Sequence, residues 1–415
     1  MPNMPNAPGT QNPQNHPGTN DSTSNSIDAK NEKHTTSVTH DTPSSKIDSL
    51  SPTDLEVLKY RYASLNFSLD SMLKHLEKSI VGQHESVRKL LFLVYNNQYL
   101  NMLEDCTGIC VKRIHGLAIG PSGVGKTTTI SKIAKLFNVP FVKVNATSLT
   151  VAGYAGGEVD SILINLIKAA GNDIDLAQRG IVFIDEFDKK RSADTNNSAG
   201  RDINGTSVQE EFLKIFEPSI VYVGKDNIPF DTHYLTVIAG GRFKGLEEIR
   251  ESRLSGPKNI GFKPVTNPEI ENISSEYISQ DLIDYGLLDE LVGRIYVIAE
   301  FKGLGFNDIL NMIYAEESIL QQYLNVFASK DVDLIIDPIH FTNMAEELAY
   351  SSTGARDLEK KIIELIFPAL YYTEQNVGPG ICEIDANGNF SCVFQSNKGT
   401  EISFSEKSSN LKISF

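Results

Sequence analysis

One stretch of the chain reads Gly120-Pro121-Ser122-Gly123-Val124-Gly125-Lys126-Thr127 and fills every fixed position of the phosphate-binding loop pattern G-x-x-x-x-G-K-[ST]. The apolar run before it, at 114–119, predicts a buried strand, and the small, apolar and basic residues at 128–136 predict a helix. Strand, glycine-rich loop and helix in this order are the context in which the pattern indicates a nucleotide site. The alternative, a glycine-rich turn with an incidental lysine, is disfavoured by that context.

The glycines of this stretch explain its chemistry. Gly120, Gly123 and Gly125 let the backbone turn tightly, so that successive N–H groups point at a di- or triphosphate. The helix that begins near Lys126 directs its positive end toward the same charge. We expect Lys126 to reach the β and γ phosphates and the Thr127 hydroxyl to ligate Mg²⁺. The predicted ATP-binding segment is Gly120, Pro121, Ser122, Gly123, Val124, Gly125, Lys126, Thr127 and Thr128.

A second apolar run, Ile181-Val182-Phe183-Ile184, ends in Asp185-Glu186. This pattern is typical of a buried parallel strand with functional side chains at its C-terminal tip. It lies far enough after Lys126 for one more strand–helix unit. We expect Asp185 to hold Mg²⁺, in part through water, and Glu186 to polarise the attacking water. A simple acidic turn is the alternative, and the upstream loop disfavours it.

Composition narrows the class of protein. The 415 residues allow two or three domains, and 40% hydrophobic and 22% charged residues describe an ordinary globular chain. The net charge of −15 argues against nucleic acid as the main partner, because phosphate backbones require a basic face. No apolar run approaches the length of a membrane span or a signal core, so no membrane partner and a cytoplasmic location are expected.

The four cysteines offer no metal-ligand spacing. Cys106 and Cys110 are close in sequence, but no Cys or His pair with zinc-ligand spacing accompanies them. We therefore expect reduced thiols and no zinc.

The order of patterns along the chain predicts an α/β fold, with a parallel sheet between helices followed by a small α-rich domain. Residues 1–68 form a leader, expected to be disordered to about residue 50, with a short helix favoured at 52–65. A large domain is expected at 69–300 and a small helical one at 301–380. In the first, helices are expected at 70–78, 84–103 and 160–170, and strands at 140–145, 234–239 and 295–299; in the second, helices are expected at 307–327, 338–350 and 355–372. An extension at 381–415 carries a hairpin pattern around Asn387-Gly388.

At this point several motifs together resemble one family. From about 69 to 372 the chain is similar to the ClpX family of AAA+ unfoldases, the ATPase partners of the ClpP peptidase. Besides the phosphate loop, the resemblance is carried by 79–83 (SIVGQ) with 94–96 (VYN), 149–156 (LTVAGYAG), 177–180 (AQRG) before Asp185-Glu186, 281–287, Gly293-Arg294 and 353–356 (TGAR).

The resemblance implies roles for residues outside the phosphate loop. Ile80 and Val81 match the segment that contacts adenine, and Arg356 matches the second sensor, which reports the nucleotide state from the small domain. Arg294 matches the arginine finger that reaches the γ-phosphate in a neighbouring subunit, which implies a ring, a homo-hexamer.

Two further segments imply the path of a substrate. Gly153, Tyr154, Ala155 and Gly156 match the pore loop that grips an unfolded polypeptide, and an aromatic between glycines gives a mobile loop with an apolar tip. Ile260, Gly261 and Phe262 match the loop that docks into ClpP.

The chain also departs from the family. It has no cysteine before Cys106, so the usual N-terminal four-cysteine zinc domain is not expected. The basic Arg-Lys-His entrance loop is absent between 217 and 234, where only 221–227 (VYVGKDN) stands, and the second pore loop at 201–207 is altered after Gly205. The motor residues are present, whereas the parts that read substrates have changed.

The leading hypothesis is an ATP-driven hexameric ring that unfolds tagged proteins and threads them into ClpP. Alternatives are a remodelling chaperone that works without a peptidase, an HslU-like ATPase, a nucleic-acid motor and an inactive nucleotide-binding scaffold. The short spacing from Tyr154 to Asp185 leaves no room for the HslU insertion. The acidic balance speaks against a nucleic-acid motor, and the filled catalytic positions speak against an inactive scaffold.

Overall fold

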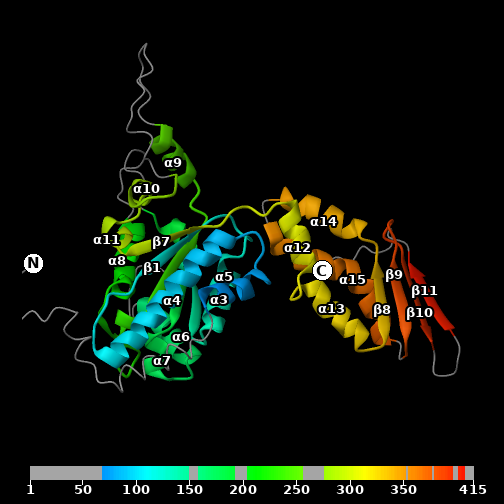
Figure 1. Cartoon of the computed structure of the whole chain (residues 1–415), viewed down its shortest axis with the longest axis horizontal. Coiled ribbons are helices and arrows are strands. Elements are labelled where there is room, and N and C mark those ends of the chain that lie inside the picture. The colour runs from blue at the N-terminus through cyan, green and yellow to red at the C-terminus, as the bar shows by residue number, and fades with distance from the viewer. Residues whose placement is uncertain are drawn as a thin grey trace, which may run out of the picture.

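The computed structural model describes residues 68–148, 158–191, 203–255, 275–351, 354–375, 378–395 and 401–406. The expected helix at 52–65, the pore segment at 153–156 and the docking tripeptide at 260–262 lie outside the described residues. The described chain forms two bodies that are joined by the segment after residue 300 (Figure 1).

The first body is built on a five-stranded parallel sheet with the order β2-β3-β6-β1-β7. Its strands are β1 (His115–Ile119), β2 (Phe141–Asn145), β3 (Ile181–Asp185), β6 (Thr236–Gly241) and β7 (Ile295–Glu300). All residues of β1 and β6 are buried, as expected for parallel strands that are covered on both faces.

Alternating side chains divide the core of this body into two layers. Leu117, Val182 and Val237 pack on one face with α6, α8, α10 and α11. Ala118 and Phe183 pack on the other face with α3, α4 and α5. The helices of the first body are α3 (Leu69–Glu77), α4 (His84–Thr107), α5 (Lys126–Leu136), α6 (Glu158–Ala169), α7 (Ile174–Gln178), α8 (Ile203–Phe216), α9 (Leu246–Ser255), α10 (Ser279–Tyr285) and α11 (Asp289–Val292). The expected α/β fold is confirmed.

The second body combines helices with a four-stranded sheet. The sheet has the order β11-β10-β9-β8, antiparallel except for the pair β8–β9. Its elements are α12 (Phe306–Tyr314), α13 (Ile319–Ala328), β8 (Val332–Ile336), α14 (Ile339–Ala349), α15 (Leu358–Gln375), β9 (Gly380–Ile384), β10 (Phe390–Gln395) and β11 (Glu401–Glu406).

This sheet refines the sequence-based expectation for the C-terminal part. The hairpin around Asn387-Gly388 is confirmed as β9–β10. Strand β8 was not expected, and it pairs with β9, so the proposed boundary at 380 falls inside one sheet. The single helix expected at 307–327 is two helices, because the Ser318 hydroxyl accepts the Gln321 N–H and begins α13.

Two other expectations are corrected. Cys382 and Cys392 lie directly opposite each other on β9 and β10 and form a disulfide, so the expectation of four reduced thiols is wrong for this pair. Strands β4 (Ile220–Val223) and β5 (Ile228–Asp231) form an antiparallel hairpin in the stretch for which only a short loop was expected. None of the helices within the described ranges is long and apolar enough to cross a membrane.

A buried histidine at the start of β1 ties the sheet to α8. His115 Nε2 lies 3.1 Å from the Phe216 carbonyl oxygen, and Nδ1 accepts the Val237 N–H at 3.2 Å. These partners require the neutral tautomer with its proton on Nε2. Burial lowers the pKa of His115 from 6.5 to about 4, although the bond to Phe216 acts in the opposite direction.

Stability should therefore depend on pH through this residue. Between pH 6.5 and about 4 the unfolded chain takes up a proton at His115 that the folded chain does not, so stability is lost as pH falls through this window. We expect the free energy of unfolding of the wild type to fall between pH 7 and 5 by about 2 kcal/mol more than that of His115→Asn. Denaturant unfolding at both pH values measures the difference. His75→Asn, at an exposed position, is the control and should behave as wild type. Equal losses in wild type and His115→Asn would contradict the assignment.

Candidate nucleotide-binding site

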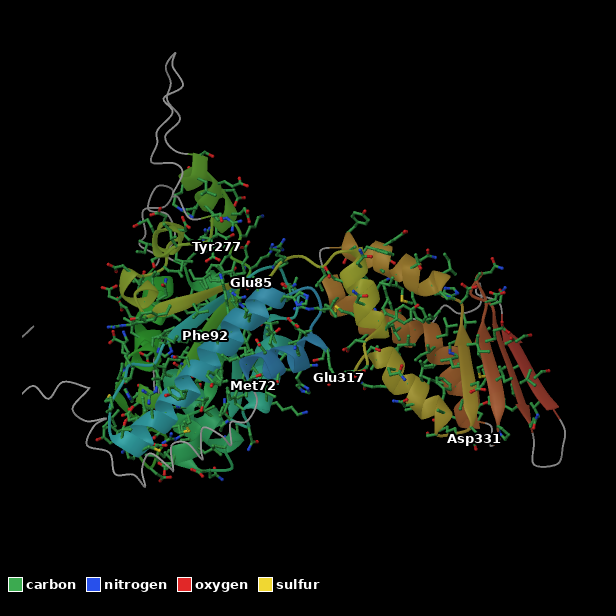
Figure 2. The ribbon with its side chains drawn as sticks, viewed as in Figure 1. Met72, Glu85, Phe92, Tyr277, Glu317 and Asp331 are labelled. Carbon is green, nitrogen blue, oxygen red and sulfur yellow. A yellow bond between two sulfur atoms is a disulfide. The ribbon has the colours of Figure 1, made fainter. Side chains whose placement is uncertain are left out.

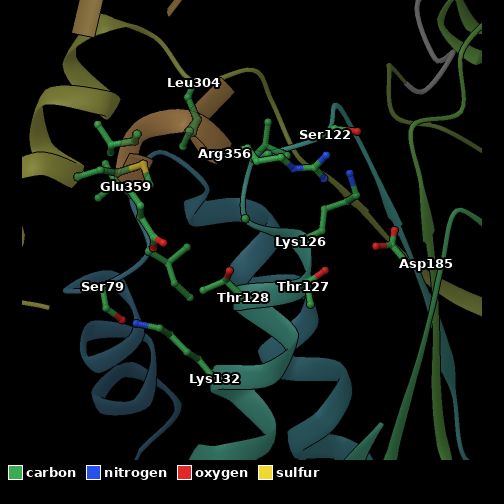
Figure 3. A pocket seen from close by; sticks show the side chains of 18 of the residues that line it. Ser79, Ser122, Lys126, Thr127, Thr128, Lys132, Asp185, Leu304, Arg356 and Glu359 are labelled. Atoms are coloured by element: carbon green, nitrogen blue, oxygen red, sulfur yellow. The ribbon is translucent and has the colours of Figure 1, made fainter. Parts of the chain in front are cut away.

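A cavity of about 720 Å³ opens between the two bodies, beside the C-terminal end of β1 (Figure 3). The predicted site residues that line it are Ile80, Val81, Ser122, Gly123, Val124, Gly125, Lys126, Thr127, Thr128, Asp185, Glu186 and Arg356. The structure thus brings together residues that are widely separated in the sequence. Gly120 and Pro121 do not line the cavity, but they shape the loop beneath it.

Backbone geometry explains why glycine stands at two positions of the loop. Gly120 has a φ of 148°, and a Cβ there would lie 2.2 Å from the Phe301 carbonyl oxygen. Gly125 has a φ of 96° and directly precedes α5. Both conformations disfavour any residue with a Cβ. Lys126, Thr127 and Thr128 in the first turn of α5 line the cavity. The N–H groups of a first turn have no partner within the helix, which suits a phosphate.

Lys126 is held within its own loop. Its Nζ donates to the carbonyl oxygens of Gly120 and Pro121, each at 2.6 Å. Burial lowers the pKa of Lys126 from 10.5 to about 8, while the nearby carboxylate of Asp185 acts in the opposite direction. An incoming phosphate would place negative charge next to this buried ammonium and so favour its charged form.

Acidic side chains line the cavity beside the phosphate loop. Asp185 ends β3, and its Oδ1 accepts the Glu186 N–H at 2.9 Å. Glu186 has a φ of 57°, in the left-handed region, which places its carboxylate 3.3 Å from the Thr147 hydroxyl. Asp188, which the sequence did not single out, also lines the cavity and accepts the Arg242 N–H at 3.3 Å.

The sequence analysis did not single out one basic side chain that lines the cavity, Lys143. Lys143 Nζ lies 2.8 Å from Asp185 Oδ2 and donates to Thr127 Oγ1 at 3.2 Å. It therefore sits between the two groups that are expected to hold Mg²⁺. A lysine within the predicted strand at 140–145 was visible, but its partners depend on the parallel pairing of β2 with β3.

The second body closes the cavity. Arg356 and Glu359 extend toward the phosphate loop from the C-terminal ribbon (Figure 3). At Gly354 a Cβ would lie 3.4 Å from the Ser122 carbonyl oxygen, so the two backbones are close. Glu317, which faces the first body in Figure 2, forms an ion pair with Lys132 at 2.6 Å. The cavity is thus shared by both bodies.

Arg294 lies away from this cavity. It directly precedes β7, at the edge of the sheet where β1 begins, and it forms an ion pair with Glu217 at 2.5 Å. The phosphate loop follows the other end of β1, and a five-residue strand spans about 16 Å. Arg294 therefore lies at the N-terminal end of the strands, whereas the phosphate loop of its own chain lies at their C-terminal end.

The geometry defines a class of protein. A parallel sheet with this loop after β1, an acidic tip on β3 and a second body over the cavity is the arrangement of an AAA+ ATPase. Residues 112–298 match the model of the AAA domain (Cdc48 subfamily). The chain is therefore an ATPase, and ATP with Mg²⁺ fits the ammonium, hydroxyl and carboxylate groups that line the cavity.

Curated relatives narrow the class further. The chain is 36% identical over 312 residues to the ATP-dependent Clp protease ATP-binding subunit ClpX of Borrelia duttonii (strain Ly), covering 72% of each chain. The same subunit of Azotobacter vinelandii is 36% identical over 307 residues, covering 69% of each. That of Treponema denticola is 33% identical over 315 residues, covering 72% of this chain and 75% of the relative. The chain belongs to the ClpX family of AAA+ ATPases.

Replacing Lys143 tests its place between Thr127 and Asp185. In Lys143→Gln the ammonium no longer competes with a divalent cation for these oxygens. We expect the Mg²⁺ concentration for half-maximal ATP hydrolysis to fall about twofold to fivefold, because a partly exposed ion pair contributes ~1 kcal/mol or less. Lys135→Gln, at an exposed position of α5, is the matched control and should leave this concentration unchanged. An unchanged or higher Mg²⁺ requirement in Lys143→Gln would refute the competition.

Proposed function

We propose that the chain is an ATP-dependent protein unfoldase and translocase that acts as a homo-hexameric ring and feeds the ClpP peptidase. The observation that supports it best is the cavity shared by the two bodies. Lys126 belongs to the first body and Arg356 to the second, so one triphosphate would contact both. Binding and hydrolysis would then change the angle between the bodies, which is the movement a translocating motor requires.

The connection between the bodies supports this coupling. The Gln83 side chain donates to the Lys302 carbonyl oxygen at 2.8 Å and accepts the Lys302 N–H at 3.0 Å. These two bonds hold the start of the connecting segment to the first body beside Ile80 and Val81, the proposed adenine contacts. Arg356 lies in the 3₁₀ turn Gly354–Asp357, which leads directly into α15, and α15 packs into the apolar core with α12, α13 and α14. Movement of Arg356 toward a γ-phosphate would therefore carry the second body with it.

The position of Arg294 supports a ring. It lies at the N-terminal end of the strands, away from its own phosphate loop, so it suits a role in the neighbouring subunit's site. A guanidinium keeps its charge and offers several donors to a γ-phosphate in the transition state. Catalysis in this account needs Lys126, Asp185 and Glu186 from one subunit and Arg294 from the next.

The proposal for substrate and partner rests on family membership and on the sequence. Tyr154 is the proposed pore residue, and Ile260-Gly261-Phe262 is the proposed docking tripeptide for ClpP. The relatives are named as ATP-binding subunits of an ATP-dependent Clp protease, and the same partnership is proposed for this chain. Tagged or unfolded proteins are the proposed substrates.

ATP-dependent loss of a folded fluorescent protein that carries candidate tags tests this function. We expect loss of fluorescence in the presence of ClpP and ATP, and a drop of roughly 100-fold or more in Glu186→Gln, because the residue that activates water is then missing. Ile260→Glu should abolish degradation by ClpP but retain ATP hydrolysis.

The same assay distinguishes the alternatives. Loss of fluorescence without ClpP that is unaffected by Ile260→Glu would indicate a remodelling chaperone without a peptidase. ATP hydrolysis without any effect on the protein substrate would contradict the unfoldase proposal. Stimulation of hydrolysis by DNA would favour a nucleic-acid motor.

A further inference from the structure

Three side chains with metal-binding atoms meet near the N-terminal end of the parallel strands, the end away from the phosphate loop. Glu104 lies in the last turn of α4, and Cys110 lies in the segment that leads from α4 to β1. His233 lies in the short 3₁₀ turn η3 (Thr232–Tyr234) between β5 and β6. The ligand atoms of the three residues all lie within 4.8 Å of one another. Neither the nucleotide cavity nor the ATPase activity uses this cluster.

The spacing within the cluster resembles that of ligands around one metal ion. His233 Nε2 lies 3.0 Å from Glu104 Oε2 and 3.4 Å from Cys110 Sγ. Tetrahedral zinc, with bonds of about 2.0–2.3 Å to N, O and S, places neighbouring ligand atoms about 3.3–3.5 Å apart. The two separations from His233 Nε2 differ from these values by only a few tenths of an ångström. Cys110 Sγ and the Glu104 carboxylate lie within 4.8 Å of each other, so an ion would draw this third pair together.

We propose that Glu104, Cys110 and His233 form a binding site for a divalent transition metal ion, with Zn²⁺ as the expected occupant and water as the fourth ligand. A thiolate, an imidazole and a carboxylate are the three ligand types that zinc takes in proteins. The proposal reverses the expectation, drawn from sequence spacing, that the chain holds no zinc.

Neighbouring groups hold two of the ligands in place. Arg113, which is fully buried, donates to Glu104 Oε2 at 2.7 Å and to Asn101 Oδ1 at 2.5 Å. The Asp231 carboxylate accepts the backbone N–H of His233 at 2.9 Å, which fixes the turn that carries this residue, and the His233 ring packs edge-on against Tyr234. Such outer contacts orient metal ligands and raise affinity.

The turn after α4 positions the third ligand. Gly108 ends the helix with a φ of 66°, and its N–H donates to the Glu104 carbonyl oxygen at 2.7 Å. This left-handed cap reverses the chain, so that Cys110 returns to the side of Glu104 in the last turn of the helix. Cys110 is exposed, whereas Glu104 and His233 are half-buried. An ion can therefore enter from the side of the sulfur, and a water ligand has room there.

A metal here would have a structural role. It would join the end of α4, the segment before β1 and the β5–β6 connection, and so add to the contacts that already link them, among them those of Glu104 with Arg113 and His233. The competing explanation is that these contacts are complete without an ion.

Cobalt titration of the metal-free full-length chain tests the proposal, because Co²⁺ replaces Zn²⁺ and absorbs strongly in the near ultraviolet when a thiolate binds it. Cys382 and Cys392 are bonded to each other, which leaves Cys106 and Cys110 as free thiols. We expect one Co²⁺ per chain with a thiolate band that Zn²⁺ displaces. We also expect Zn²⁺ to raise the melting temperature and a chelator to reverse the rise.

Variants make the result specific. Cys110→Ser should abolish the thiolate band, and His233→Gln should weaken Co²⁺ binding about tenfold or more. Cys106→Ser is the matched control on α4 and should retain both the band and the affinity. Retained ATP hydrolysis in Cys110→Ser would show that the variant is folded. Absence of a thiolate band in the wild type, or a band that survives in Cys110→Ser, would overturn the proposal.

Discussion

The contact between the end of β1 and the segment that leaves the first body is the constraint on which the site depends. The Phe301 N–H donates to the Ile119 carbonyl oxygen at 2.7 Å, and the Gly120 N–H donates to the Gly241 carbonyl oxygen at 3.1 Å. The phosphate loop therefore begins at a residue held between β6 and β7. Because Gly120 has no Cβ, the Phe301 carbonyl can lie against it. The loop that would bind phosphate and the chain that leads to the second body are in direct contact.

This contact explains how nucleotide binding and hydrolysis could move the second body relative to the first. The apolar core beneath α5 continues without interruption into α12, α13, α14 and α15. On the other side of the cavity, Lys132 and Glu317 join the bodies through an exposed ion pair, which contributes little stability. The bodies are thus held firmly near Phe301 and weakly across the cavity. A ligand that attracts Arg356 would shift the second body about this connection.

The sequence predicted the five strands of the parallel sheet in the first body, and it singled out the phosphate loop, Asp185 and Glu186, which line the cavity. A phosphate loop and an acidic strand tip are local sequence patterns. They can be placed together without a structure, because the C-terminal ends of all strands in a parallel sheet lie at the same end of the sheet. Side-chain contacts that depend on which strands or segments lie side by side could not be predicted in this way. Lys143 meets Asp185 only because β2 lies beside β3, and Cys110 meets His233 across 123 positions of sequence. Strand β8 was missed because it is a five-residue run between helices, and its partner β9 follows α15.

The central claim is that each ATP site is completed by a neighbouring subunit, and co-assembly of two inactive variants tests it most directly. Glu186→Gln lacks the residue proposed to polarise water, and Arg294→Ala lacks the proposed arginine finger. In equally mixed rings, about a quarter of the interfaces would pair an intact Glu186 with an intact Arg294. The account predicts that each variant alone is inactive and that mixed rings regain ATP hydrolysis. Mixed rings that stay as inactive as the separate variants would contradict it.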